Sequence, residues 1–399
     1  MTPDHTGLGR YRRLLSGPGM AGCAVAALAS KLQGSMFTLS LLLTVAATRS
    51  YGVAGAVAAV SALGGIAAPA RGRLLDRLPY AAVLWSAIAL HAALVALIVV
   101  NELAHGPVLL TFAGALAANT VAPPVGVLSR VMWRSVTGEE TRSTALALDA
   151  VLADAGFIVG PLLVGALSSV LVPQVALGTS VLTSVLATVL LLRALAGREP
   201  AKSVGKEQNW KGSLTSVPLR MHLGCALFFS AAVGVVEVSL ISHGGELLGS
   251  VSVSVLAAGS IAGGLLIGAL PPERAAQVSR LPRLLVYLGL AATVLAVAGT
   301  GNTMVAIALM LTVGTAFGPC FVAVYGLTGD LAPAGTAAET QAWVGAALQS
   351  GSALGQAAGA FAFGLWGFSA GVGLAPVFAL LAAGLGALTA RLPRPVPAP

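Results

Sequence analysis

The sequence predicts an all-α integral membrane protein with twelve transmembrane helices, and its composition is the first reason. Of the 399 residues, 57% are hydrophobic and only 9% are charged, with a mean hydropathy of +0.91. Soluble globular chains carry roughly a quarter of their residues as charged side chains. A soluble enzyme, a nucleic-acid-binding protein and a disordered scaffold are therefore excluded.

The second reason is the length of the apolar runs. A spanning helix needs about 20 apolar residues, whereas a β-barrel shows short alternating strands. The first run follows a basic segment but is too long for a signal peptide and has no clear cleavage site, so we expect an uncleaved first helix. The predicted helices cover residues 18–47, 52–70, 79–100, 107–129, 143–171, 174–194, 219–241, 250–270, 283–299, 303–326, 337–365 and 370–390.

The third reason is that basic residues gather on one side of the predicted membrane. The two tails and the second, fourth, sixth and eighth connections hold 20 of the 22 Lys and Arg residues. Of the other two, Arg49 lies in the first connection and Lys31 lies inside the first run. Positive charge is retained on the cytoplasmic side. We therefore expect a multi-pass protein of the cytoplasmic membrane, with an even number of spans and both termini in the cytoplasm.

The chain is also expected to be divided at its centre. The longest polar stretch, residues 197–218, separates six predicted helices from six others, and its basic surplus places it on the cytoplasmic face. The halves are residues 1–196 and 219–399. The fifth and eleventh runs match at an offset of 195 residues, since Thr141, Gly156 and Gly160 correspond to Thr336, Gly351 and Gly355. Many transporters are built from such repeats, with a substrate site between the halves.

Residues 70–79, between the second and third predicted helices, read Ala-Arg-Gly-Arg-Leu-Leu-Asp-Arg-Leu-Pro. They resemble the loop signature of the major facilitator superfamily, G-x-L-x-D-R-x-G-R-R, at Gly72, Leu74, Asp76 and Arg77. The likeness ends at Pro79, which stands where the second glycine belongs. The resemblance implies two pseudo-symmetric six-helix bundles that rock about a central substrate site.

The same likeness implies a cytoplasmic gate. Asp76 is expected to face the positive N-terminus of the helix that starts near Ala337, with Arg77 paired to a nearby carboxylate and Gly72 allowing a tight turn. Such contacts would latch the cytoplasmic side in the outward-open state. The simpler reading is that the basic residues here only set the topology. The equivalent segment of the second half, 271–274, lacks the pattern, so any latch is asymmetric.

A second motif lies in the fifth predicted helix. The run Gly156-Phe-Ile-Val-Gly160-Pro161-Leu-Leu-Val-Gly165 resembles the G-x-x-x-G-P-x-x-G-G motif of the antiporter branches of the superfamily. Pro161 removes one backbone hydrogen bond and bends the helix. The glycines are expected to pack against the eighth helix at Gly259 and Gly263 and to resist leakage, although ordinary packing is the plainer reading.

Charged residues inside the predicted spans are the candidates for substrate binding and proton coupling, because such residues are costly unless they are paired or functional. They are Lys31, Asp154 and Glu237, in the first, fifth and seventh helices. Our hypothesis is that Asp154 or Glu237 couples proton entry to substrate exit, with Lys31 as counter-charge. A structural Lys–carboxylate pair is the alternative. Asp149 lies nearer the cytoplasm and is read as structural.

We therefore predict a proton-coupled exporter of a small amphipathic compound, a drug or a metabolite. The alternatives are an uptake symporter for a sugar, amino acid or organic acid, a membrane enzyme, or a non-transporting sensor. Neither a P-loop nor an HExxH motif is present, and the three cysteines form no CxxC pair. We expect no cofactor and no metal, with a proton gradient as the energy source. The expected partners are the small-molecule substrate, protons and membrane lipid, without nucleic acid. A monomer suffices, because one chain holds both halves.

Overall fold

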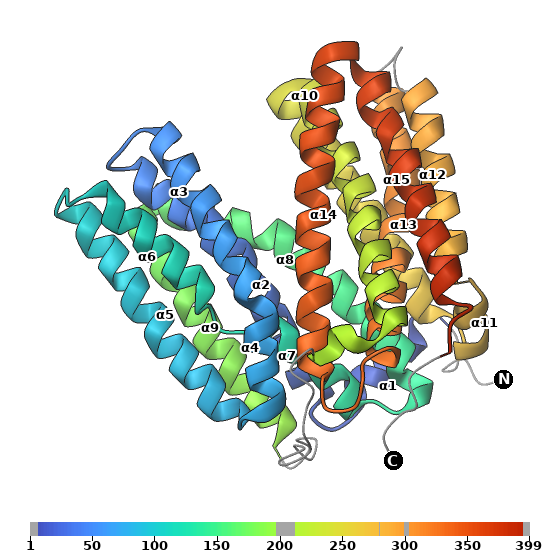
Figure 1. Cartoon of the computed structure of the whole chain (residues 1–399), viewed down its shortest axis with the longest axis horizontal. Coiled ribbons are helices and arrows are strands. Elements are labelled where there is room, and N and C mark those ends of the chain that lie inside the picture. The colour runs from blue at the N-terminus through green and yellow to red at the C-terminus, as the bar shows by residue number, and fades with distance from the viewer. Residues whose placement is uncertain (1–6, 197–211, 279, 299–302, 394–399) are drawn as a thin grey trace.

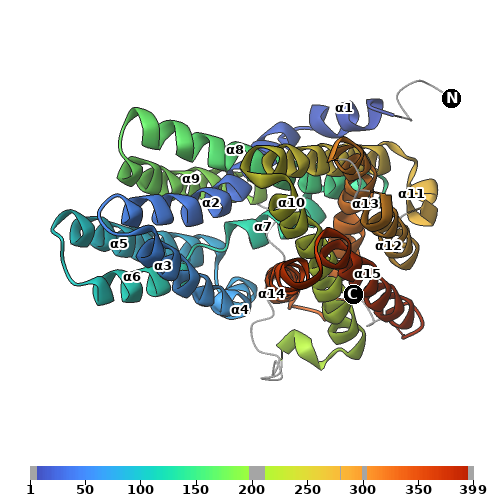
Figure 2. The same ribbon diagram turned by 90° about the horizontal axis from the view of Figure 1, so that it is seen from above.

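The computed structural model describes residues 7–196, 212–278, 280–298 and 303–393, and it is built from helices packed into two bundles (Figure 1). The bundles meet at one end of the molecule and diverge toward the other. We call the end where they meet the basal end and the opposite end the apical end. Figure 2 shows the bundles side by side, with α4, α7 and α8 of the first bundle nearest the second.

The N-terminal bundle comprises α1 to α9. Their bounds are α1 Gly9–Ser16, α2 Met20–Ala46, α3 Tyr51–Leu63, η2 Gly64–Ala67, α4 Ala68–Arg77, α5 Tyr80–Leu103, α6 Val108–Thr120, α7 Val125–Val136, α8 Glu139–Val170 and α9 Pro173–Leu195. At the basal side, Trp133, Leu84 and Leu191 are fully buried in one core cluster. A second cluster forms around Leu41, Ile98 and Leu177.

The C-terminal bundle comprises α10 to α15. Their bounds are η3 Gly212–Thr215, α10 Val217–Ala269, α11 Pro272–Val278, α12 Leu281–Ala298, α13 Thr303–Asp330, α14 Ala337–Trp366 and α15 Phe368–Thr389. Its core is one continuous cluster. Most of the predicted linker, residues 197–211, lies outside the described residues.

The helices have the length and composition that a membrane requires. Eleven segments of the described chain are long and apolar enough to span one. They include both parts of α10, residues 217–239 and 251–269, which the sequence predicts as separate helices and which belong to one helical element. The predicted span 337–365 is not among the eleven. It corresponds to the helix α14, 30 residues long, which runs beside both parts of α10 over the height of the second bundle (Figure 1).

Two of the predicted spans are interrupted, contrary to expectation. The span 52–70 is divided by the 3-10 turn η2, and the span 107–129 is divided after Thr120. Pro123 and Pro124 account for the second break, because proline lacks the N–H that would continue the helix. The first break is packed against the second. If Gly64 carried a side chain, its Cβ would lie only 2.6 Å from the backbone nitrogen of Thr120.

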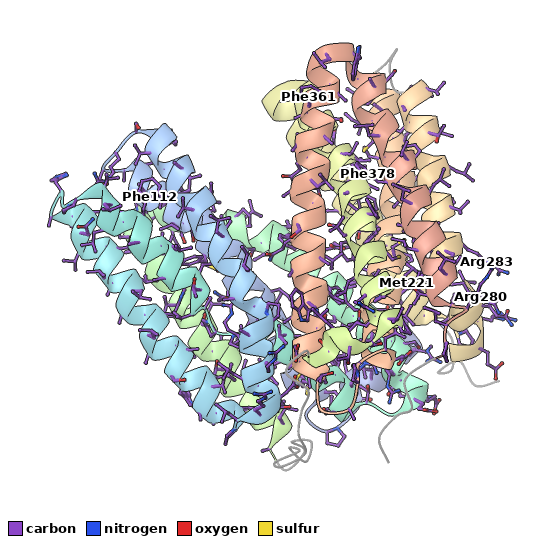
Figure 3. The ribbon with its side chains drawn as sticks, in the orientation of Figure 1. Phe112, Met221, Arg280, Arg283, Phe361 and Phe378 are labelled. Atoms are coloured by element: carbon purple, nitrogen blue, oxygen red, sulfur yellow. The ribbon has the colours of Figure 1, made fainter. Side chains whose placement is uncertain are left out.

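Charge is distributed unequally between the two ends. The helix α1, the end of α4, the end of α7 and the segment with Arg280 and Arg283 all lie at the basal end (Figures 1 and 3). At the apical end, Arg49 is paired with the buried Glu102, with 2.9 Å between Nε and Oε2. Both α1 and the last turn of α15 lie at the basal end (Figure 1).

Candidate functional site

The candidate site is the interface between the bundles, and its basal part is built on α4 and α14. The two Asp76 carboxylate oxygens accept hydrogen bonds from the backbone N–H groups of Ala338 (2.9 Å) and Glu339 (2.8 Å). These N–H groups belong to the first turn of α14 and have no partner within the helix. The negative carboxylate also faces the positive end of the helix dipole. Asp76 therefore joins the two bundles by hydrogen bonds.

Gly72 lies at the closest approach of the same two helices. A Cβ at this position would lie 2.7 Å from the carbonyl oxygen of Ala338 and 2.9 Å from Cα of Glu339. The expectation that Gly72 allows a tight turn is wrong, because residues 71–77 continue α4 and do not form a loop. Glycine is needed here because the α14 backbone leaves no space for a side chain.

A bidentate ion pair beside Asp76 was not anticipated from the sequence. Arg73 donates to Glu339 from Nη2 (2.7 Å to Oε1) and from Nε (3.2 Å to Oε2). Glu339 Oε1 also accepts bonds from the backbone N–H (3.3 Å) and hydroxyl (3.2 Å) of Ser213 in η3. Gly72 and Arg73 lie four and three residues before Asp76, so both lie near Asp76 on the helix surface. This spacing in the sequence could have indicated that Arg73 lies beside Asp76 at the start of α14. Arg77 is the last residue of α4, and its carboxylate partner stays a prediction.

A second set of contacts joins α7 to α13. Arg134 Nη2 donates to Asp330 Oδ1 (2.9 Å) and to the carbonyl of Gly326 (2.5 Å). Arg130 Nη2 donates to the hydroxyl of Tyr325 (2.9 Å), and its guanidinium carbon lies 4.0 Å from the centre of that ring. Sequence reasoning read both arginines only as topology determinants, because their partners are about 195 residues away in the chain.

The glycines of the fifth-helix motif pack within their own bundle, so the expected contact with the eighth helix is wrong. A Cβ at Gly156 would lie 2.8 Å from Cβ of Lys31, and one at Gly160 would lie 2.9 Å from Cβ of Ser35. Both neighbours are in α2. Small residues one turn apart let two helices approach closely, and here they join α8 to α2.

The other members of that motif face outward. Pro161 is exposed and lies inside α8, which continues through it. Gly165 is exposed, and a Cβ there would meet nothing within 4 Å. In the second bundle, Gly259 and Gly263 pack against α13. A Cβ at Gly259 would lie 3.0 Å from Cα of Gly314, and one at Gly263 would lie 2.9 Å from Cδ of Pro319.

Lys31 is paired with Asp149, which corrects the expectation that it is the counter-charge of Asp154 or Glu237. The Lys31 Nζ and Asp149 Oδ2 atoms are 3.0 Å apart, and both side chains are at most 7% exposed. Asp149 Oδ2 lies 3.9 Å from Arg130 Nε. Its Oδ1 accepts bonds from Trp133 Nε1 (3.0 Å) and the Ser129 hydroxyl (3.3 Å). Asp149 is therefore the buried centre of a cluster that holds two cations.

Asp154 and Glu237 come from opposite bundles. Asp154, in α8, accepts a hydrogen bond from the Ser260 hydroxyl of α10 at 2.7 Å. Glu237, in the first part of α10, is hydrogen-bonded to the Gln356 side chain of α14 and interacts electrostatically with Asp154. In the described part of the chain, neither carboxylate has a basic nitrogen within 4.0 Å. Among the same residues, no three His, Cys, Asp or Glu side chains converge in a way that could hold a metal ion.

Comparisons with known proteins agree with this architecture. The family model described as Major Facilitator Superfamily matches residues 19–356. A bacterial homologue of the iron transporter ferroportin, in an outward-facing state, is similar in structure with a TM-score of 0.74 and 16% identity, over 93% of this chain and 98% of that one.

Two further solved structures share the fold. The E. coli fucose:proton symporter FucP has a TM-score of 0.71 and 14% identity, over 95% of this chain and 100% of that one. The human organic anion transporter MFSD10 (TETRAN) has a TM-score of 0.62 and 15% identity, over 97% and 100%. A search of the curated proteins found no match. Because the family model covers most of the sequence and the fold is shared over nearly its full length, the chain belongs to the Major Facilitator Superfamily and is a multi-pass secondary transporter, not an enzyme.

Proposed function

We propose that this transporter exports a small amphipathic organic compound in exchange for protons, by alternating access. The two bundles, residues 1–196 and 219–399, rock as units joined by the linker 197–218. The basal end is the cytoplasmic end, because it carries nearly all of the basic residues. Both termini are then cytoplasmic, and the conformation described above is closed toward the cytoplasm.

The observation that carries this proposal is the position of Asp154 and Glu237. Each is partly buried, comes from a different bundle and lacks an ion-pair partner among the described residues. When the bundles separate at the basal end, the bond between Asp154 and Ser260 breaks and the distance between the carboxylates changes. The protonation of both groups therefore depends on the conformation, and by linkage the conformation depends on protonation.

The α4–α14 contacts act as the cytoplasmic gate in this scheme. Opening toward the cytoplasm must break the Asp76 bonds to the first turn of α14 and the ion pair between Arg73 and Glu339. Both contacts are charge-assisted and so are stronger than ordinary hydrogen bonds. They hold the cytoplasmic side shut while the substrate leaves on the other side.

Apolar helices around a few charged groups suit an amphipathic substrate. The export direction is supported by the likeness of residues 156–165 to the antiporter motif. Protons, the substrate and lipid are the only partners required, and a monomer is sufficient.

The test is a flux assay in everted membrane vesicles with an imposed pH gradient. Candidate amphiphiles are screened for substrate-induced proton release. Asp154→Asn and Glu237→Gln should each insert normally and abolish coupled transport. Glu139→Gln is the matched control, because this exposed acid begins the same helix as Asp154. Normal coupled transport in both core variants would refute the assignment.

A second candidate function, proton-coupled uptake of an organic acid, is favoured by the cluster around Asp149. Lys31 and Arg130 face a single carboxylate, which leaves one buried positive charge in excess. An anionic solute would balance it. In right-side-out vesicles, accumulation of a radiolabelled organic acid under an inward proton gradient, with no export in everted vesicles, would favour uptake.

A further inference from the structure

The basal end has a second contact between the bundles, where α8 meets the end of α10. The last carbonyl groups of a helix have no donor within it. The Thr144 hydroxyl of α8 donates to the carbonyl of Gly268 at 2.9 Å, and the backbone N–H of Gly7 donates to that of Ala269 at 3.1 Å. The N-terminal bundle thus caps the C-terminus of α10.

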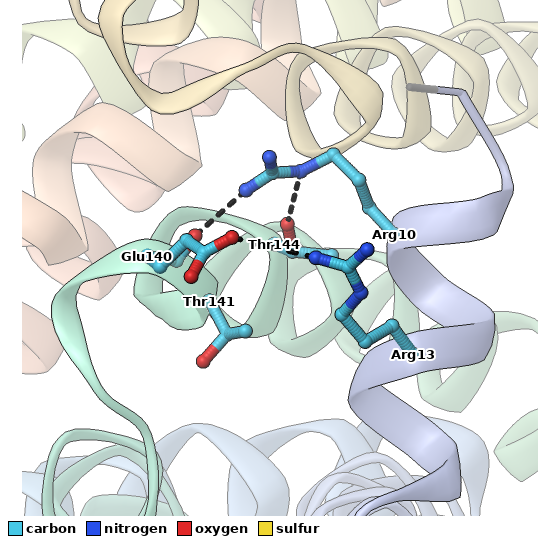
Figure 4. Close-up of a pocket in the computed structure, with 5 residues that line it drawn as sticks. All are labelled: Arg10, Arg13, Glu140, Thr141 and Thr144. Atoms are coloured by element: carbon cyan, nitrogen blue, oxygen red, sulfur yellow. Dashed lines mark hydrogen bonds and ion pairs between the residues drawn. The ribbon is translucent and has the colours of Figure 1, made fainter. Parts of the chain in front are cut away.

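The short helix α1 is anchored to the first bundle, as Figure 4 shows. Arg10 donates to the Thr144 hydroxyl from Nε (3.2 Å) and to the Glu140 carbonyl from Nη2 (2.7 Å). Arg13 forms a longer ion pair with Glu140 (3.4 Å). Only residues 17–19 separate α1 from α2. The helix α1 is therefore attached to the N-terminal bundle by its chain and by its arginines.

The opposite face of α1 reaches the second bundle. The buried Tyr11 hydroxyl donates to the carbonyl of Leu265 at 3.0 Å. A phenol is protonated and can donate at physiological pH, and burial raises the pKa of Tyr11 further. Gly268 makes room for it: a Cβ there would overlap the Tyr11 hydroxyl and would lie 2.6 Å from Cβ of Ala147. The fit requires a glycine on α10 and a tyrosine on α1.

The contact between α1 and the end of α10 lies beside the segment of the second half that lacks the signature found at residues 72–77. In the first half, Asp76 binds the N-terminus of α14. Residues 271–274 of the second half, Pro-Pro-Glu-Arg, lack that signature and follow directly after the end of α10. We propose that α1 is a clasp that closes this second basal interface, with Arg10 as its anchor and Tyr11 as its releasable contact. This inference rests on the alternating access proposed above.

The clasp predicts which bonds break when the cytoplasmic side opens. Tyr11, Gly7 and Thr144 leave the α10 carbonyls, while Arg10 and Arg13 stay on α8 and α1 moves with the N-terminal bundle. Weakening the releasable contact favours the basal-open state. Removing one hydrogen bond should raise the ratio of basal-open to basal-closed molecules about fivefold, the factor that corresponds to a net value of about 1 kcal/mol.

The experiment measures distances between spin labels on the full-length protein in nanodiscs. Glu139→Cys and Gln277→Cys place labels at exposed positions on the two sides of this interface. The three native cysteines are buried, so labelling at these positions is selective. Tyr11→Phe keeps the ring and removes only the hydroxyl, and Arg10→Gln removes the anchor. Gly268→Ala blocks the fit from the α10 side. Arg12→Gln, on the exposed face of α1, is the control.

The clasp predicts a larger long-distance population in Tyr11→Phe, Arg10→Gln and Gly268→Ala, and an unchanged one in Arg12→Gln. Distances in Tyr11→Phe and Gly268→Ala that match those of Arg12→Gln would overturn it. The measurement needs no substrate, so it tests the clasp even if export is not found. Conversely, loss of proton coupling in Asp154→Asn tests the proposed function without involving α1.

Discussion

Replacing Asp76 by Asn tests the gate most directly, because it removes a charge and one acceptor while keeping the side-chain shape. The aspartate accepts two bonds, from Ala338 and Glu339. The amide NH₂ of asparagine would face one of these N–H groups instead. We expect Asp76→Asn to shift the conformational equilibrium toward the basal-open state.

The magnitude follows from the geometry. A hydrogen bond to a charged group contributes about 1.5–3 kcal/mol, and a carboxylate at a helix N-terminus gains a further 0.3–1 kcal/mol or so. Asn keeps one neutral bond of about 1 kcal/mol. Over the two bonds the net loss is at least about 2 kcal/mol, which corresponds to a change of roughly 30-fold or more in the ratio of basal-open to basal-closed molecules.

The assay is again a distance measurement, with labels at Leu78→Cys and Ala334→Cys beside the α4–α14 contact, both exposed positions. Asp330→Asn is the matched control, since it makes the same chemical change in another contact between the bundles. Its ion pair with Arg134 is half exposed and should contribute at most about 1 kcal/mol. If Asp76→Asn shifts the ratio no more than Asp330→Asn does, Asp76 does not hold the gate.

Three further predictions concern packing and buried charge. Gly72→Ala should open the basal end at least as strongly as Asp76→Asn, because its Cβ would meet the α14 backbone; an unchanged distance distribution would contradict this. Gly156→Ala should lower the free energy of unfolding in detergent by about 1–3 kcal/mol, and with it the melting temperature, because its Cβ would overpack against α2. Gly165→Ala, whose Cβ would meet open space, should have little effect on either quantity. Equal melting temperatures for the two variants would show that α2 and α8 can separate without cost. Asp149→Asn should destabilise the fold by about 3–5 kcal/mol because it leaves Lys31 buried without its counter-ion, and the additional change Lys31→Met should restore much of that loss; a double variant no more stable than Asp149→Asn would refute the pairing argument.

Most of the spans were predicted from the sequence, but the two interruptions were not. A helix in hydrocarbon must present apolar side chains along about 20 residues, so composition alone reveals where it runs. The break near Pro123 and Pro124 had a local signal. The 3-10 turn begins at the Gly64-Gly65 pair, a weaker local signal, and it also depends on the close approach of Thr120 from a neighbouring helix.

The choice of partners inside the interface was decided by the tertiary structure. Asp149 and Asp154 are five residues apart, which places them about 140° apart around a helix. Lys31 can therefore reach only one of them, and the rotation of α8 against α2, which is determined by Gly156 and Gly160, selects Asp149. The same rotation turns Asp154 toward Ser260 in the other bundle.

Composition, apolar run length and the sidedness of charge together determined that this chain spans a membrane many times, because lipid penalises each exposed polar group wherever it lies along the chain. The motif residues further predicted that Asp76 faces the start of α14. Only the packed structure decided that Arg73 binds Glu339, that Lys31 binds Asp149 and that α1 reaches α10. Each of these pairs spans more than 100 residues of sequence. Such contacts depend on how whole helices are rotated and placed, and no local pattern encodes that.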